Sequence, residues 1–196
     1  MSFQTCRGQA LPTIIQVAQE RSKLAGRRRA RHSAYSCMAG FLMVVAAGLM
    51  ILLLFLPVLE VSGRSMEPTL RDGDVLILRH ADAIHPGAMC GMYAKGRLIL
   101  KRIIALPGDV VDMDGEGNVF VNGEPLQEPY VSQKCVGVCD QSFPLQVPAG
   151  QLFVMGDHRE TSIDSRSELI GCVEVEQVIG QVVARIWPLD AIAWME

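Results

Sequence analysis

The sequence predicts a mainly β protein: an antiparallel β-sheet domain preceded by one N-terminal transmembrane helix. Two observations support this prediction. After residue 60 the chain alternates short apolar runs with Gly- and Pro-containing turns and shows almost no helical periodicity, a pattern typical of antiparallel sheets. Before residue 60 it contains one long run, Ser33–Leu59, without a charged side chain.

That uncharged run is long enough to cross a bilayer, which takes about 20 apolar residues, and we expect an anchor helix over residues 37–59. An arginine cluster within residues 27–31 precedes it, whereas Glu60 is the first charge after it. Because positive charges flank the cytoplasmic end of such helices, the N-terminus is expected in the cytoplasm and residues 60–196 outside. A cleaved signal peptide would have a shorter core ending in small residues, whereas this run ends in Leu56–Val61; a transit peptide is a further alternative.

Charge divides the chain at the same place. Residues 1–36 carry seven Lys/Arg and one acid, whereas the remainder carries eleven Lys/Arg and twenty acids. A basic N-terminal segment followed by an acidic remainder argues against a nucleic-acid-binding domain, because the basic patch of such a domain should lie on its folded part. The basic segment is either a short amphipathic helix on the inner leaflet or a disordered tail.

The β-rich domain is predicted over residues 60–196. Its expected strands, in chain order, are Val75–Leu78, Leu98–Ile104, Asp109–Asp112, Asn118–Asn122, Leu152–Met155, Val173–Val175 and Val178–Trp187. Residues 123–151 are expected to form a loop-rich small subdomain or insertion. Gly180, inside the last strand, indicates a bulge or a close backbone approach.

Ser65 is the first candidate for chemistry. It lies between Gly63 and Pro68, so we expect it on a constrained turn that presents its hydroxyl. Met66 is expected to anchor this turn on apolar surface. Such a serine is a nucleophile only if a base reaches it; otherwise it is an ordinary turn serine.

Lys101 is the candidate base. In a strand it shares its face with Ile99 and Ile103, so it is either buried or extends its ammonium group out to water. Burial lowers a lysine pKa, and a neutral amine can serve as general base to a serine. A third segment, residues 156–166, is dense in polar side chains and follows an apolar strand directly, which suits a buried polar network.

Together these segments resemble the sequence boxes of bacterial type I signal peptidases, which are serine proteases with a Ser-Lys dyad. The matching stretches are Ser65–Leu70, Lys101–Arg102 followed by Leu106–Asp109, and Gly156–Asp157 with Ser162–Arg166. They occur in the family's order after a single anchor, and the resemblance covers roughly residues 40–188.

The resemblance implies a role for each matching residue. Ser65 would be the nucleophile, Lys101 the general base, and Ser162 the residue that orients the lysine. Asp157, Asp164 and Arg166 would hold the site together by a salt bridge, and Met66 would pack below the substrate. The oxyanion would rest on backbone amides, chiefly that of Ser65.

The family's substrates are signal peptides of exported preproteins, with small residues at positions −1 and −3. The resemblance therefore implies a bacterial inner (plasma) membrane protein whose catalytic domain faces the periplasm or the outside. Its partners would be preproteins and the lipid bilayer, with no cofactor, metal or nucleic acid.

The sequence departs from the family at two positions. Gly63 stands where some members have a serine that helps the oxyanion hole, and it could let the backbone close in instead. His158 stands where the family usually has Asn, so a Ser-His-Asp triad is an alternative to the lysine.

Cys135 and Cys139 flank a central glycine on the expected oxidising side and are candidates for a disulfide. His80, His85 and Cys90 lack the regular spacing of a zinc site. Residues 112–118 imitate the start of a calcium loop, but they lack its terminal glutamate, so an acidic hairpin turn is favoured.

Two further functions compete with a signal peptidase. A Ser-Lys self-cleaving regulator shares the serine and lysine, but it would carry a DNA-binding domain where this chain has its apolar run. A catalytically inactive relative acting as a binding module would not need Ser65, Lys101, Ser162 and Asp164 to be intact.

Overall fold

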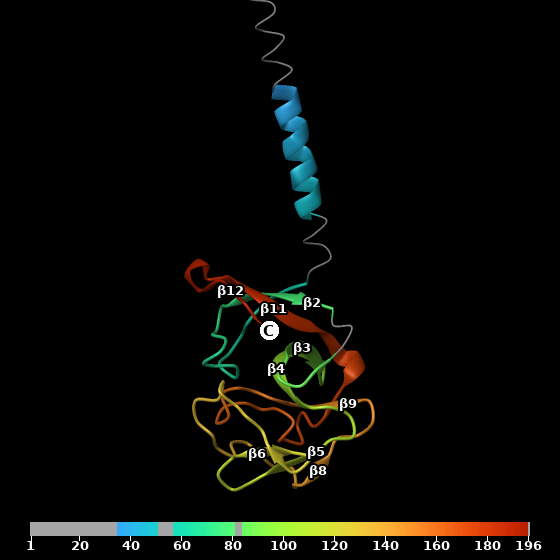
Figure 1. Cartoon of the computed structure of the whole chain (residues 1–196), viewed down its shortest axis with the longest axis vertical. Coiled ribbons are helices and arrows are strands. Elements are labelled where there is room, and N and C mark those ends of the chain that lie inside the picture. The colour runs from blue at the N-terminus through green and yellow to red at the C-terminus, as the bar shows by residue number, and fades with distance from the viewer. Residues whose placement is uncertain (1–34, 51–56, 81–83, 196) are drawn as a thin grey trace, which may run out of the picture. The chain divides into compact units, whose positions relative to one another are not determined.

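The computed structural model describes residues 35–50, 57–80 and 84–195. The chain divides into two compact units, residues 1–54 and 55–196. In the first, residues 35–50 are helical and exposed (Figure 1). Over the described ranges, no helix combines the length and the apolar content that a bilayer crossing requires.

The predicted helix over residues 37–59 therefore needs a correction at its end. Residues 51–56 of that prediction lie outside the described residues. Strand β1 covers Val58–Glu60, so the expectation that the helix reaches Leu59 is wrong. Pairing and burial explain the change, because the Pro57 carbonyl accepts from the Leu78 N–H at 2.9 Å and Leu59 packs against the β core.

The second unit is built from antiparallel sheets, as predicted. In its described residues the large sheet has the order β1-β2-β11-β3-β4-β9-β10, with β12 added to β11 (Figure 1). The bounds of the strands after β1 are β2 Val75–Arg79, β3 Met89–Ala94, β4 Arg97–Ala105, β9 Gln151–Met155, β10 Val173–Glu174, β11 Val178–Trp187 and β12 Ala193–Trp194. Two 3₁₀ turns accompany them, η1 Val175–Gln177 and η2 Leu189–Ala191.

A smaller sheet has the order β7-β6-β5-β8. Its strands are β5 Val110–Met113, β6 Val119–Val121, β7 Glu124–Pro125 and β8 Leu145–Gln146. Residues 123–150 thus contribute two strands of two residues each and are otherwise irregular, and Gln151 begins β9. The loop that imitates a calcium site is the β5–β6 hairpin turn, where Asp114 accepts hydrogen bonds from the Asn118 backbone and side chain at 2.9 and 2.7 Å.

The predicted strands are confirmed at β2, β4, β5, β6, β9, β10 and β11. Gly180 is a close approach, as expected: a Cβ there would lie 2.6 Å from the Arg79 carbonyl oxygen. The ladder between β11 and β3 shifts register next to it. Glycine therefore lets the end of β2 approach β11 closely, where the two strands pair in the large sheet.

Candidate active site

Ser65 lies in the loop that joins β1 to β2. The base of this loop is closed by the Val61 N–H, which donates to the Asp74 carbonyl at 2.8 Å. One helical turn follows the serine, with the Leu70 N–H donating to the Met66 carbonyl at 2.9 Å. Because Met66 and Leu70 are buried at 1% and 0% exposure, the turn is fixed from below while Ser65 stays half-buried at its surface.

Lys101 lies in β4 and is 4% exposed. With Ser65 it lines a cavity of about 300 Å³. The other walls are Leu59, Glu60, Val61, Ser62, Met66, Leu98, Ile99 and Leu100. The structure thus brings the predicted nucleophile and the predicted base, 36 positions apart in the sequence, to one largely apolar cavity.

Burial lowers the pKa of Lys101 below its ordinary value of 10.5. Loss of water around the ammonium group is the largest cause. The carboxylates of Asp164 and Asp157 oppose this shift, whereas Arg166 adds to it. The predicted alternative of an amine extended into water does not occur in the structure, and the amine is a candidate general base.

Gly156 lies between Ser162 and the turn Ser65–Leu70, which carries the predicted nucleophile (the nucleophile turn). A Cβ built on this glycine would lie 2.4 Å from the Ser65 carbonyl oxygen and 2.2 Å from the Ser162 Oγ. The next contact in the block is the His158 N–H, which donates to the Ser65 carbonyl at 3.0 Å. The polar block therefore packs directly on the nucleophile turn, and only glycine fits at this position.

Ser162 is fully buried. Within the described residues its Oγ has no hydrogen-bond partner, and the Lys101 ammonium group likewise makes no hydrogen bond or ion pair. Buried hydroxyls are normally paired, since an unpaired one costs stability. A buried hydroxyl without a partner, next to the turn that carries Ser65, is therefore typical of a residue retained for function and not for stability. In the described structure it makes no hydrogen bond with Lys101.

Asp164 and Arg166 form a buried pair. The Arg166 Nε and Nη2 donate to the two carboxylate oxygens at 2.9 Å each. Asp164 also accepts from the Gly156 N–H at 2.9 Å. This pair therefore fixes the backbone of the glycine that touches Ser65.

The resemblance implied that Asp157 belongs to the same salt bridge as Asp164 and Arg166. In the structure Asp157 binds a different arginine. It pairs with Arg102, whose Nε and Nη2 donate at 2.9 and 2.7 Å. Its second oxygen also accepts from the Thr69 Oγ1 at 2.6 Å. Asp157 thereby ties the strand that carries Lys101 to the turn that carries Ser65.

Four further members of this network were given no role from the sequence, namely Arg102, Glu128, Tyr130 and Arg159. Arg159 pairs with Glu128, and both side chains are buried; Arg102 also lies 3.9 Å above the Tyr130 ring. Arg102 had a readable signal, since a charged residue inside an apolar strand needs a partner. Glu128 lies in an irregular segment that gave no signal.

Gly63 and His158 occupy the positions where the sequence departs from the family. Gly63 has a φ of 93°, and its N–H donates to an Asp72 carboxylate oxygen at 2.7 Å. The N–H of Ser65 makes no hydrogen bond with a described residue, which leaves it as a donor for an oxyanion. The imidazole Nδ1 of His158 lies 3.0 Å from the Thr161 Oγ1, and His158 does not line the cavity that holds Ser65.

Cys135 and Cys139 are both free thiols in the structure, so the expected disulfide is not formed. The segment between them is irregular and is not a hairpin. A different contact fixes this segment: the Arg166 Nη1 donates to the Val136 carbonyl at 2.7 Å. In the described part of the chain, no group of three His, Cys, Asp or Glu side chains could hold a metal ion.

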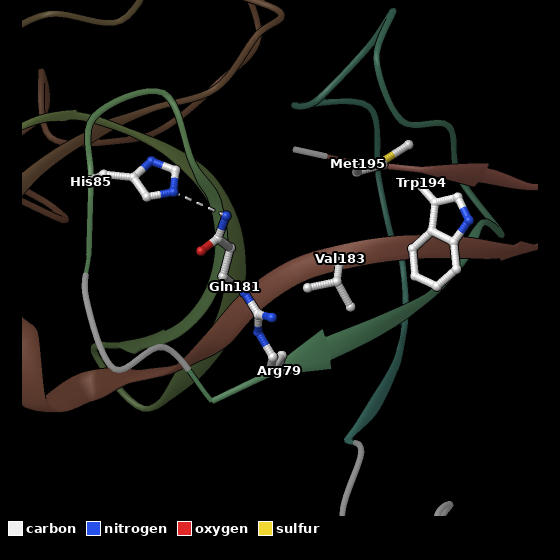
Figure 2. Close-up of a pocket in the computed structure, with 6 residues that line it drawn as sticks. All are labelled: Arg79, His85, Gln181, Val183, Trp194 and Met195. Atoms are coloured by element: carbon white, nitrogen blue, oxygen red, sulfur yellow. Dashed lines mark hydrogen bonds between the residues drawn. The ribbon is translucent and has the colours of Figure 1, made fainter.

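A second, larger cavity of about 440 Å³ lies on another part of the domain (Figure 2). It is lined by Arg79, His85, Gln181, Val183, Trp194 and Met195. In Figure 2 the Gln181 amide points to the His85 ring, 3.3 Å away. None of the predicted site residues lines it, so the smaller cavity is the candidate active site.

Comparison with known proteins gives the family of this chain. A family model described as "Signal peptidase, peptidase S26" matches residues 34–187. The signal peptidase I of Bacillus licheniformis is 35% identical over 167 residues, which cover 76% of this chain and 86% of that protein.

Two further proteins are similar to this chain. Signal peptidase I U of Bacillus subtilis (strain 168) is 32% identical over 151 residues, covering 71% of this chain and 80% of that protein. A crystal structure of a signal peptidase I from Enterococcus faecalis V583 is 26% identical, with a TM-score of 0.44 over 51% of this chain and 97% of that one.

Proposed function

The chain belongs to the signal peptidase family, peptidase S26, and we propose that it is a serine endopeptidase that removes N-terminal signal peptides from exported preproteins. In this proposal Ser65 is the nucleophile and Lys101 the general base. The observation that carries it is that a half-buried serine and a buried lysine of lowered pKa line the same cavity.

The reaction follows from these groups. The neutral Lys101 amine takes the Ser65 proton as the hydroxyl oxygen attacks the peptide carbonyl. The backbone N–H of Ser65 stabilises the oxyanion. The lysine then gives its proton to the leaving amine, which frees the mature protein. The same amine deprotonates a water molecule, and the resulting attack releases the signal peptide from the serine.

Asp164, Arg166 and Asp157 support this reaction through the elements that carry the reacting groups. Asp164 and Arg166 fix Gly156 against Ser65, and Asp157 joins the two elements that carry the dyad. Ser162 is proposed to orient the lysine amine from its buried position. Met66 forms the floor of the cavity.

We propose that the substrate binds as an extended strand along the open edge of β1. Six of the ten residues that line the cavity are apolar and the space is about 300 Å³, which suits small side chains at positions −1 and −3. Main-chain hydrogen bonds to a sheet edge would give affinity, and the cavity would give specificity.

We also propose that residues 37–56 anchor the protein in a bacterial plasma membrane. The support lies in the sequence: an uncharged run with a basic segment before it and an acidic domain after it. The N-terminus would then be cytoplasmic and the catalytic domain outside, where signal-peptide cleavage sites emerge.

Incubation of detergent-solubilised protein with a purified preprotein tests the dyad. Ser65→Ala and Lys101→Ala are expected to abolish release of the mature protein, whereas His158→Ala retains it. Circular dichroism should show that all three variants are folded. Full processing by Lys101→Ala together with an inactive His158→Ala would assign the base to the histidine. Loss of mass from the enzyme itself, with an intact preprotein, would favour a self-cleaving regulator.

A further inference from the structure

The open edge of β1 presents the backbone of Glu60 to the cavity. Among the described residues β1 pairs only with β2, in the register Val58–Ile77, Leu59–Leu76 and Glu60–Val75. The Pro57 carbonyl accepts from the Leu78 N–H at 2.9 Å, and the Val61 N–H donates to Asp74 at 2.8 Å. Because backbone groups alternate along an antiparallel strand, residues 57, 59 and 61 bond to β2, and Glu60 turns its N–H and C=O outward.

The side chains of this edge also alternate. Val61 is 6% exposed, and Leu59 packs with it against the core. Glu60 lies on the other face of the strand and is exposed. It still belongs to the rim of the cavity that holds Ser65 and Lys101. Among the described residues its carboxylate makes no hydrogen bond or ion pair.

A bound substrate strand must alternate in the same way. This step depends on the proposed function, in which the small residues at −1 and −3 enter the cavity beside Leu59 and Val61. The side chains at −2 and −4 then lie on the face of Glu60. Neighbouring strands place such side chains close enough to interact, and opposite charges there are favourable whereas like charges are not.

We propose that Glu60 is a specificity-determining residue that favours a basic side chain at substrate position −2 or −4. Positions −2 and −4 are the candidates because their side chains lie on the same face of the sheet as Glu60. The register of the bound strand decides which of the two lies next to Glu60. Position −3 is excluded for a basic residue, because that side chain would enter the aliphatic cavity.

Peptides with one cleavage site test this inference. Each carries Lys, Gln or Glu at −2, or the same three residues at −4, and kcat/KM is measured at low ionic strength. For the wild-type full-length protein we expect the Lys peptide to exceed the Gln peptide roughly two- to fivefold at one of these positions. The ratio should fall toward one in Glu60→Gln and reverse in Glu60→Lys, which should prefer the Glu peptide.

Glu124→Gln is the matched control. Glu124 is an exposed acid in β7 of the smaller sheet, so its loss changes net charge equally and should leave the ratio at the wild-type value. Raised salt should weaken the wild-type preference. Equal cleavage of the Lys, Gln and Glu peptides at both positions would overturn the inference alone. Failure to cleave any peptide or preprotein would overturn the proposed function and this inference with it.

Discussion

At the scale of single residues, the environment of Lys101 decides whether the site can work near neutral pH. Serine needs a base that is uncharged at the working pH. Loss of water lowers the pKa of this lysine, and the pairing of Asp164 with Arg166 keeps the nearest carboxylate occupied. We therefore expect kcat/KM to rise with pH through the lowered pKa.

The same burial links the stability of the fold to pH. The folded-state pKa of Lys101 lies below the ordinary 10.5, so between these two values the unfolded chain binds a proton that the folded chain does not. The free energy of unfolding therefore rises with pH between these two values. Below the folded-state pKa both states are protonated, so the free energy of unfolding no longer changes with pH and includes the full cost of burying the charge.

Lys101→Met tests this linkage. The variant should be inactive and more stable than wild type at and below neutral pH, since it removes a buried amine. Its advantage should shrink as the pH approaches 10.5. Urea unfolding of both proteins over this pH range measures the difference. A constant difference would show that the amine titrates normally in the folded protein.

Ser162→Ala separates orientation from stability. In the described structure the Ser162 hydroxyl is buried without a partner, so its removal should leave the free energy of unfolding unchanged or slightly higher. If the hydroxyl orients the lysine, kcat should fall by about 100-fold, which is what a small misplacement of a catalytic group costs. A large loss of stability with normal kcat would assign Ser162 a structural role.

The sequence could predict which residues are candidates for the site, but it could not predict which of them pair with each other. Ser65 and Lys101 stood out as a serine on a constrained turn and a lysine in an apolar strand, but each had an ordinary alternative. The resemblance to the family's sequence boxes assigned their roles. The partner of Asp157 could not be found in this way. Arg102 and Arg166 are equally plausible partners on the sequence, and only the packing of β4 against the polar block selects Arg102.

At the scale of elements, the nucleophile turn is held from two sides through Thr69. Its Oγ1 donates to Asp157 at 2.6 Å, and its carbonyl accepts from the Arg185 Nη1 at 3.3 Å. Arg185 lies in β11 and also pairs with Asp74 at the base of the loop. The position of Ser65 therefore depends on two neighbouring elements.

Thr69→Val removes the first of these ties and keeps the shape of the side chain. Loss of a hydrogen bond to a charged group should lower the free energy of unfolding by about 1–3 kcal/mol, and kcat should fall because the turn is less well fixed. Thr69→Ser is the control and should retain both values. Chemical unfolding and preprotein cleavage measure them, and wild-type behaviour of the valine variant would show that the tie is dispensable.

Gly156→Ala tests the contact between the polar block and the nucleophile turn. The added Cβ would lie 2.2–2.4 Å from Ser162 and Ser65, so one of these elements must shift. We expect cleavage to fall by about 100-fold or more. Gly150→Ala is the control for a glycine substitution, since a Cβ there meets no atom within 4 Å although its φ is positive. Normal cleavage by Gly156→Ala would show that the contact can relax.

Elements were predictable where the apolar run is long. β4 and β11, with nine and ten residues, were found from sequence because each carries its own strand pattern. β1, β7, β8 and β12, with two or three residues each, were missed because so short a run has no pattern of its own. β1 was also hidden in the apolar run, although it forms the edge that we propose binds substrate.

At the scale of the whole molecule, the chain separates into a unit with the helical residues 35–50 and a unit that holds the cavity. In the part of the chain that the structure describes, the core clusters, the buried ion pairs, Ser65 and Lys101 belong to residues 57–195. Catalysis on a free peptide should therefore need only the second unit. Processing of a preprotein in a bilayer should need both, because an anchor confines enzyme and substrate to the same surface.

A protein that begins at Phe55, the first residue of the second unit, tests this division. On a soluble peptide its kcat/KM should match that of the full-length chain. On a preprotein reconstituted in vesicles, the full-length chain should be faster by roughly 100-fold, since tethering raises the effective concentration. The full-length Ser65→Ala variant gives the background in both assays. Equal rates on the vesicle substrate would show that residues 1–54 do not bring the enzyme to the membrane, and a shortened protein that is folded but inactive on the peptide would show that the second unit is not catalytically complete.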